Sequence, residues 1–110
     1  MFRQLRSQKG LTLVELMVVV AIIAIIAAVA ITVFQDIQKK AKLAADQANT
    51  ASMRSGVAIY YGKNNGIFPA ARAAVNALVT PLPVWQCTGG VPTYIVANGK
   101  LNFTATIGDC

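Results

Sequence analysis

Sixteen consecutive uncharged apolar residues, Leu16 to Ile31, constrain this chain more than any other feature. A helix that is apolar on every side has to lie in a bilayer or against other apolar helices. A basic leader that ends at Lys9-Gly10 precedes this run, and one acid, Glu15, adjoins it. A carboxylate near the end of a membrane segment is costly unless a positive group meets it. No basic side chain follows Glu15 until Lys39, so the cheapest partner is the α-amino group that a cut after Gly10 creates.

The residues of this junction resemble the prepilin signature of type IV pilins and their pseudopilin relatives. The matching positions are Lys9-Gly10 at the processing site, Leu11 as the first mature residue and Glu15 as the fifth. The resemblance is close over residues 7–45. It implies cleavage between Gly10 and Leu11 by a prepilin peptidase, followed by N-methylation of Leu11. It also implies that Glu15 helps the processing and assembly machinery recognise the subunit, and that it pairs with the amino terminus of Leu11 in an adjoining subunit.

Plainer interpretations of the same residues stay open. An ordinary signal anchor has the same apolar run, with Gly10 as a flexible loop before the helix and Glu15 stabilised by the helix macrodipole. Conventional secretory cleavage follows the apolar region at small residues, and the chain has alanines there, Ala24, Ala27, Ala28 and Ala30. We favour a cut before the apolar run, which keeps the apolar helix in the product.

The predicted fold is α+β, with a long N-terminal helix followed by a small head. We expect a leader over residues 1–10, a helix over 11–61 and a head over 62–110, with 11–34 as the membrane or filament-core part of the helix. Many type IV pilins have Gly where this chain has Ala24 and Pro where it has Thr32, so we expect a continuous helix here.

The second half of this helix is amphipathic. An apolar face formed by Leu43, Met53, Val57 and Tyr60 is expected to pack on the head. Asp36 and Asp46 are interpreted as solvated charges on the helix surface.

The head is predicted to contain a short helix over about residues 70–79 and about three antiparallel strands, at 84–88, 91–97 and 100–107. Asn98-Gly99 is the strongest short hairpin signal in the chain. On the last strand, Leu101, Phe103, Ala105 and Ile107 are expected to share one face.

Cys87 and Cys110 are the only cysteines, and both lie on the side that a signal anchor exports. In an oxidising compartment they are expected to form a disulfide, which stabilises the fold by roughly 3 kcal/mol in the chain-entropy model. Two free buried thiols are the alternative. Two cysteines without a histidine make only half of a zinc site, so we expect no metal and no cofactor.

The charged residues do not point to an enzyme. The chain has no histidine, and its four acids are Glu15, Asp36, Asp46 and Asp109. General acid–base catalysis usually needs His or paired carboxylates in a pocket, so we expect no catalytic residue. Loss of Arg3, Arg6 and Lys9 with the leader lowers the net charge from +6 to +3, which is too mild to argue for nucleic acid. A weak basic patch of Lys63, Arg72 and Lys100 is more simply explained as solvated surface.

Three functions are compatible with this pattern. The first is a structural subunit of a type IV pilus, a homo-oligomeric helical filament for adhesion, motility or DNA uptake, held in the inner membrane as a precursor and extracellular after assembly. The second is a pseudopilin of a type II secretion or competence system. Some pseudopilins bind calcium through acidic loop residues, and the head offers only Asp109, which favours the pilus. The third is a membrane-anchored receptor, but a simple anchor has no need of a helix beyond Phe34.

Overall fold

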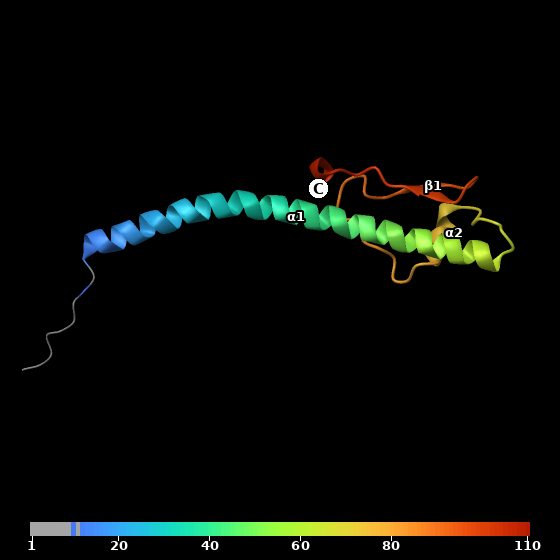
Figure 1. The fold of residues 1–110 in the computed structure, drawn as a ribbon, viewed down its shortest axis with the longest axis horizontal. Helices are drawn as coiled ribbons and strands as arrows, with labels where there is room; N and C mark the ends of the chain where they lie inside the picture. The colour runs from blue at the N-terminus through green and yellow to red at the C-terminus, as the bar shows by residue number, and fades with distance from the viewer. Residues whose placement is uncertain (1–9, 11) are drawn as a thin grey trace, which may run out of the picture. The chain divides into compact units, whose positions relative to one another are not determined.

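The computed structural model describes residue 10 and residues 12–110, in two compact units that divide between Gln35 and Asp36. Helix α1 runs Leu13–Lys63 and contributes to both units, and helix α2 runs Arg72–Ala77. Strands β1 (Thr93–Ile95) and β2 (Lys100–Asn102) form an antiparallel sheet, and a 3-10 turn, η1, covers Ile107–Asp109 (Figure 1). The structure confirms the predicted α+β class with a long N-terminal helix, a short helix and a small sheet.

Helix α1 is continuous through Ala24 and Thr32, as expected from the absence of proline. The Thr32 hydroxyl donates to the carbonyl of Val29 at 2.9 Å, inside the helix itself. The helix ends two residues later than predicted, where Asn65 and Gly66 adopt positive φ angles of 54° and 84°. Such left-handed residues terminate helices by redirecting the backbone.

The hydrophobic core of the second unit is small. It consists of Met53 and Val57 from α1, Val75 from α2 and Leu101 from β2. Partly buried side chains pack around this cluster, namely Phe68, Val79, Trp85 and Tyr94. The two central residues of the predicted packing face of α1, Met53 and Val57, are therefore in the core. Apolar burial there stabilises the unit by about 25 cal/mol per Å² removed from water.

The hairpin pairs Thr93 with Asn102, Tyr94 with Leu101 and Ile95 with Lys100. Residues 96–99 connect the strands, so the turn is longer than the two-residue form that Asn-Gly favours. The Asn98 side chain accepts the N–H of Lys100 at 3.1 Å, and Gly99 has a φ of 64°. A Cβ on Gly99 would collide with the ring of Phe68, so this position needs glycine for both its φ and its close approach.

The predicted strand at 84–88 does not form; within the part of the chain that the structure describes, the sheet has two strands and not three. The N–H groups of Gln86 and Cys87 donate instead to the side chain of Asp46, and the carbonyl of Val84 accepts from Asn49. Backbone groups that are satisfied by helix side chains are not available for a ladder.

The other predicted elements are shorter than expected. The ladder of β2 stops at Asn102, because its partner strand is preceded by Pro92, which has no N–H to donate. Residues 101–105 nevertheless keep the predicted alternation of more buried and exposed side chains. Ile107 was expected on the buried face but lies in η1, where it is 44 % exposed.

Candidate processing and assembly site

The first turn of α1 contains a reciprocal capping arrangement between Thr12 and Glu15. The N–H of Thr12 donates to Oε2 of Glu15 at 2.9 Å, and the N–H of Glu15 donates to Oγ1 of Thr12 at 3.2 Å. This is a capping box, which satisfies two N–H groups that a helix start leaves without partners. Glu15 therefore stabilises the start of the helix, which was one of the two roles left open by the sequence. Its partner Thr12 was missed in the sequence analysis. The pattern Thr-x-x-Glu before an apolar run is its sequence signal.

The predicted processing positions lie immediately before this capping box. Gly10 is exposed, and a Cβ built on it would meet no atom within 4 Å. Leu11 lies outside the described residues, so cleavage before it and methylation of its amine stay predictions. Among the described residues nothing thus crowds Gly10, the residue that the resemblance assigns to the end of the leader.

The large apolar side chains of the first unit, on both sides of Glu15, are all exposed, from 73 % at Leu13 to 51 % at Val19. Among the described residues, α1 is the one helix long and apolar enough to cross a bilayer. A helix with this much exposed apolar surface is stable only in lipid or against other apolar helices.

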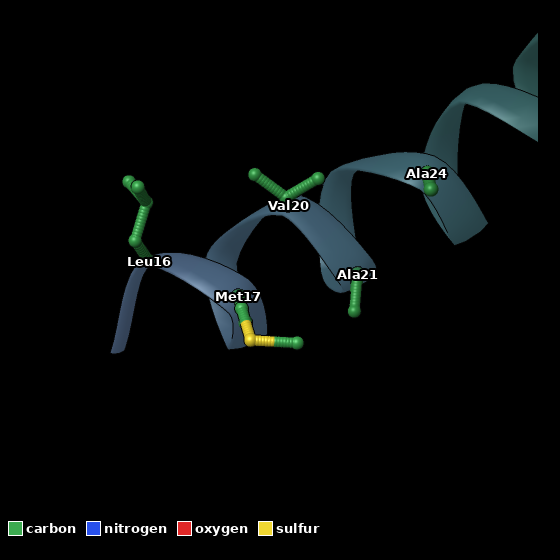
Figure 2. A pocket seen from close by; sticks show the side chains of 5 residues that line it. All are labelled: Leu16, Met17, Val20, Ala21 and Ala24. Carbon is green, nitrogen blue, oxygen red and sulfur yellow. The ribbon is translucent and has the colours of Figure 1, made fainter. Parts of the chain in front are cut away.

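A hollow of about 320 Å³ lies on this part of α1, and Figure 2 shows the side chains around it. Its lining is almost entirely apolar and comprises Leu16, Met17, Val20, Ala21 and Ala24. In Figure 2 the Leu16 and Val20 side chains point upward from the ribbon, whereas the Met17 and Ala21 side chains lie below it. Small residues beside larger ones give another helix room to approach closely, as in membrane bundles.

In the second unit, Cys87 and Cys110 form the predicted disulfide, with their Cα atoms 4.3 Å apart and a sequence separation of 23. Cys87 is buried, at 6 % exposure. Beside the disulfide, the N–H of Thr88 donates to the carbonyl of Asp109 at 2.8 Å. The two ends of the cysteine-bounded segment are therefore joined by a covalent bond and a backbone hydrogen bond.

The interpretation of Asp46 as a solvated charge is wrong: this residue is 0 % exposed, whereas Asp36 is exposed as expected. The sequence feature that indicates the burial of Asp46 is its helical phase. It shares a face with Thr50, Met53 and Val57, at spacings of four and three residues, and all four are buried. A buried carboxylate requires partners, and those partners are backbone N–H groups of the head.

The three basic residues interpreted as solvated surface, Lys63, Arg72 and Lys100, are partly engaged by the fold. The guanidinium of Arg72 donates to the carbonyl of Pro92. Arg54, which the sequence analysis did not single out, donates to the carbonyl of Leu101 at 2.8 Å. With Gly99, Lys100 and Asn102, Arg54 lines a second hollow of about 330 Å³. Both arginines therefore hold head segments in place, while Lys63 and Lys100 are exposed.

Two ionisable groups of the head have shifted pKa values. Burial, with a smaller effect from nearby Tyr60, raises the pKa of the Tyr94 hydroxyl, which donates to the carbonyl of Pro69 at 2.9 Å. The N–H and then the hydroxyl of Thr106 lower the pKa of Asp109. Both groups form hydrogen bonds within the head. No cluster of three or more metal-binding side chains occurs among residues 10 and 12–110.

Comparison with known proteins identifies the N-terminal segment. Residues 5–31 match the family model of the prokaryotic N-terminal methylation motif. No curated protein and no solved structure matches the chain. The matched range includes the basic leader, Gly10, Leu11, the Thr12–Glu15 capping box and the apolar run to Ile31. Such a motif implies processing by a prepilin peptidase and the pilus machinery. Residues 5–31 therefore match the prokaryotic N-terminal methylation motif, the class III signal peptide of type IV pilins, and this motif supports a pilin-like or pseudopilin-like precursor.

Proposed function

We propose that this protein is a structural subunit of a type IV pilus, assembled into a helical filament through the apolar part of α1. The observation that carries the proposal is the matched motif joined to a long exposed apolar helix with one carboxylate, Glu15, at its start. Lipid holds this helix in the precursor, and sister helices replace lipid in the filament. The exchange costs little because both surroundings are apolar.

Cleavage between Gly10 and Leu11 supplies the cation that Glu15 needs. The new α-amino group of Leu11, N-methylated in the mature chain, remains positively charged near neutral pH. The Thr12–Glu15 capping box engages Oε2, and the amine of an adjoining subunit pairs with the same carboxylate through Oε1. Removing one partner of such a desolvated pair typically costs 3–5 kcal/mol. Glu15 therefore guides each subunit to its register in the filament.

Substitution of Glu15 tests this mechanism, and glutamine separates its two roles. Glu15→Gln keeps a side-chain oxygen for the capping box but removes the charge, whereas Thr12→Val removes the hydroxyl acceptor and keeps the charge. We expect Glu15→Gln and Glu15→Ala to abolish filament recovery from sheared cells, and Thr12→Val to retain filaments. Asp36→Asn, which removes an exposed acid from the same helix, is the matched control. Normal filament yield from Glu15→Gln would refute the pairing mechanism.

Mass spectrometry of the mature protein tests the cleavage. We expect a chain that starts at Leu11 and carries one added methyl group on its amine. A mature chain that starts at Met1, or after Ala28 or Ala30, would contradict the assignment of Gly10 as the last leader residue.

A pseudopilin of a type II secretion or competence system is the second candidate, because the motif and the apolar helix serve both kinds of protein. The filament itself separates them. A pilus subunit is recovered in long filaments sheared from the cell surface, whereas a pseudopilin stays in a short periplasmic assembly. Adhesion, motility and DNA uptake are then separated by the phenotype of a deletion strain.

A further inference from the structure

The buried carboxylate of Asp46 holds the backbone of one cysteine. The N–H of Gln86 donates to Oδ1 at 2.9 Å and to Oδ2 at 3.1 Å, and the N–H of Cys87 donates to Oδ2 at 2.9 Å. Asp46 lies on α1, forty residues or more before these donors in sequence. Hydrogen bonds to an ionised acceptor are shorter and stronger than neutral ones. We call this arrangement, Asp46 with the N–H groups of Gln86 and Cys87, the carboxylate anchor.

Gly90 closes the same loop over the carboxylate. Its N–H donates to the carbonyl of Cys87 at 2.9 Å, and a Cβ at this position would overlap Oδ2 of Asp46. Gly90 is itself buried. Any larger residue at position 90 therefore displaces either the loop or the carboxylate.

The second cysteine is held independently of α1. The η1 turn before Cys110 is fixed by the Asp109 carboxylate, which accepts from the N–H and the hydroxyl of Thr106 at 2.6 and 2.8 Å. The N–H of Thr88 then donates to the carbonyl of Asp109, which brings the two cysteine segments together. The carboxylate anchor thus holds the backbone of Cys87 against α1, and η1 places Cys110 beside Cys87.

We propose that Asp46 is a positioning residue for the oxidation of Cys87 and Cys110. The anchor forms before the disulfide and raises the effective concentration of one thiol at the other. In the reaction, the thiolate of one cysteine attacks a disulfide oxidant and forms a mixed disulfide, which releases one thiol of the oxidant. The thiolate of the second cysteine then displaces the other thiol. Two electrons and two protons pass from the cysteine pair to the oxidant, which is reduced to two thiols.

The first test measures the effective concentration of the thiol pair. The full chain in detergent micelles is equilibrated with reduced and oxidised glutathione, and the oxidised fraction is read by thiol alkylation and mass spectrometry. Asp46→Asn replaces one accepting oxygen by an NH₂ group, which faces backbone N–H donors and cannot accept from them. We therefore expect the effective concentration to fall at least about tenfold, which corresponds to the loss of one charge-assisted hydrogen bond. Asp36→Asn is the matched control and is expected to stay within about twofold of the wild type. Equal values for Asp46→Asn and the wild type, or equal falls in both variants, would overturn the proposal.

A second variant keeps the carboxylate and changes only its access to the loop. Gly90→Ala is expected to reduce the effective concentration as Asp46→Asn does, whereas Gly62→Ala, where a Cβ meets no atom within 4 Å, leaves it unchanged. A wild-type value in Gly90→Ala would count against the anchor.

The order of events is tested without changing Asp46 at all. In the full-length double variant Cys87→Ser/Cys110→Ser, hydrogen exchange of the amides of residues 86 and 87 reports whether the anchor forms without the disulfide. We expect both amides to exchange at least about tenfold more slowly than an unprotected peptide. Exchange at the unprotected rate would show that the disulfide creates the anchor, which is the reverse of the proposal.

Discussion

Glu15 and Asp46 are both acids on α1, and both accept hydrogen bonds from backbone N–H groups. Their partners differ in sequence distance. Glu15 accepts from the N–H of Thr12 in its own helix turn, three residues away, whereas Asp46 accepts from the N–H of Gln86 in a loop forty residues away. The first arrangement follows from local sequence, because a capping box has a fixed spacing. The second arrangement depends on where the head folds back against α1. The helical phase of Asp46 therefore predicts that it is buried, but nothing in the sequence predicts which N–H groups donate to it.

Asp109 is expected to make stability depend on pH at the acid end. The Thr106 N–H and hydroxyl lower its pKa in the folded chain below the ordinary 3.8, so the unfolded chain takes up the proton first as the pH falls. The stabilisation is complete above the ordinary pKa and is lost as the pH falls through the lowered folded value. The melting temperature of the full chain in detergent should exceed that of Asp109→Asn at pH 7, and the difference should shrink as the pH falls through the lowered folded pKa. Asp36→Asn controls for the loss of a surface charge, and a difference that persists in acid would contradict this role.

Gly99→Ala should destabilise the hairpin strongly. The new Cβ collides with Phe68, and alanine is disfavoured at a φ of 64°. Together we expect a loss of about 2–4 kcal/mol in unfolding free energy, from left-handed backbone strain and overpacking. Urea unfolding followed by the fluorescence of Trp85 measures it. Gly62→Ala meets no such contact and should be neutral or slightly stabilising, so equal effects of the two substitutions would refute this account.

Among the elements, helices were more predictable than strands. The long run without proline predicts α1 to within two residues at each end, because helix formation depends on local periodicity. The strand predicted at 84–88 has an equally good local pattern, but Asp46 and Asn49 satisfy its backbone first. A strand requires a partner, and the partner is decided by tertiary contacts. The same reasoning explains why β2 ends at Asn102, opposite the residue that follows Pro92.

The two faces of α1 in the second unit should respond differently to truncation. Met53 is 0 % exposed in the core, whereas Ile59 is 60 % exposed on the same helix. We expect Met53→Ala to lower the unfolding free energy by about 2–5 kcal/mol through the cavity that it leaves. Ile59→Ala should change it by less than about 0.5 kcal/mol in chemical unfolding. A larger loss of unfolding free energy in Ile59→Ala than in Met53→Ala would show that the core packs on the Ile59 face of the helix, contrary to this account.

In the molecule as a whole, four buried apolar side chains from α1, α2 and β2 form the central core cluster of the second unit. Domains this small usually need a crosslink, because they bury too little apolar surface to offset chain entropy. The sequence therefore predicts the disulfide from compartment and size. It does not predict the hydrogen-bonded loop around Cys87, because that loop needs a carboxylate from a distant helix turn.

Reduction of the disulfide should destabilise the second unit without unfolding the apolar part of α1. For a sequence separation of 23 between the cysteines, the chain-entropy model gives a loss of about 3 kcal/mol. We expect a lower melting temperature for the near-ultraviolet signal of Trp85 after reduction, with most helical signal retained in detergent. The variant Cys87→Ser/Cys110→Ser is the control for side reactions of the reductant. An unchanged melting temperature would show that the crosslink adds nothing to the fold.

The burial of Asp46 also changes how the second unit interacts with dissolved ions. Dissolved cations cannot contact a carboxylate that water does not reach, which leaves Asp36 and Asp109 as the acidic side chains of the unit that ions can contact directly. They are outnumbered by the cationic side chains of the same unit, Lys39, Lys40, Lys42, Arg54, Lys63, Arg72 and Lys100. The unit as a whole is therefore cationic and attracts counter-anions near neutral pH. Because mobile ions screen such exposed charges over about 8 Å at physiological ionic strength, this attraction weakens as salt is added.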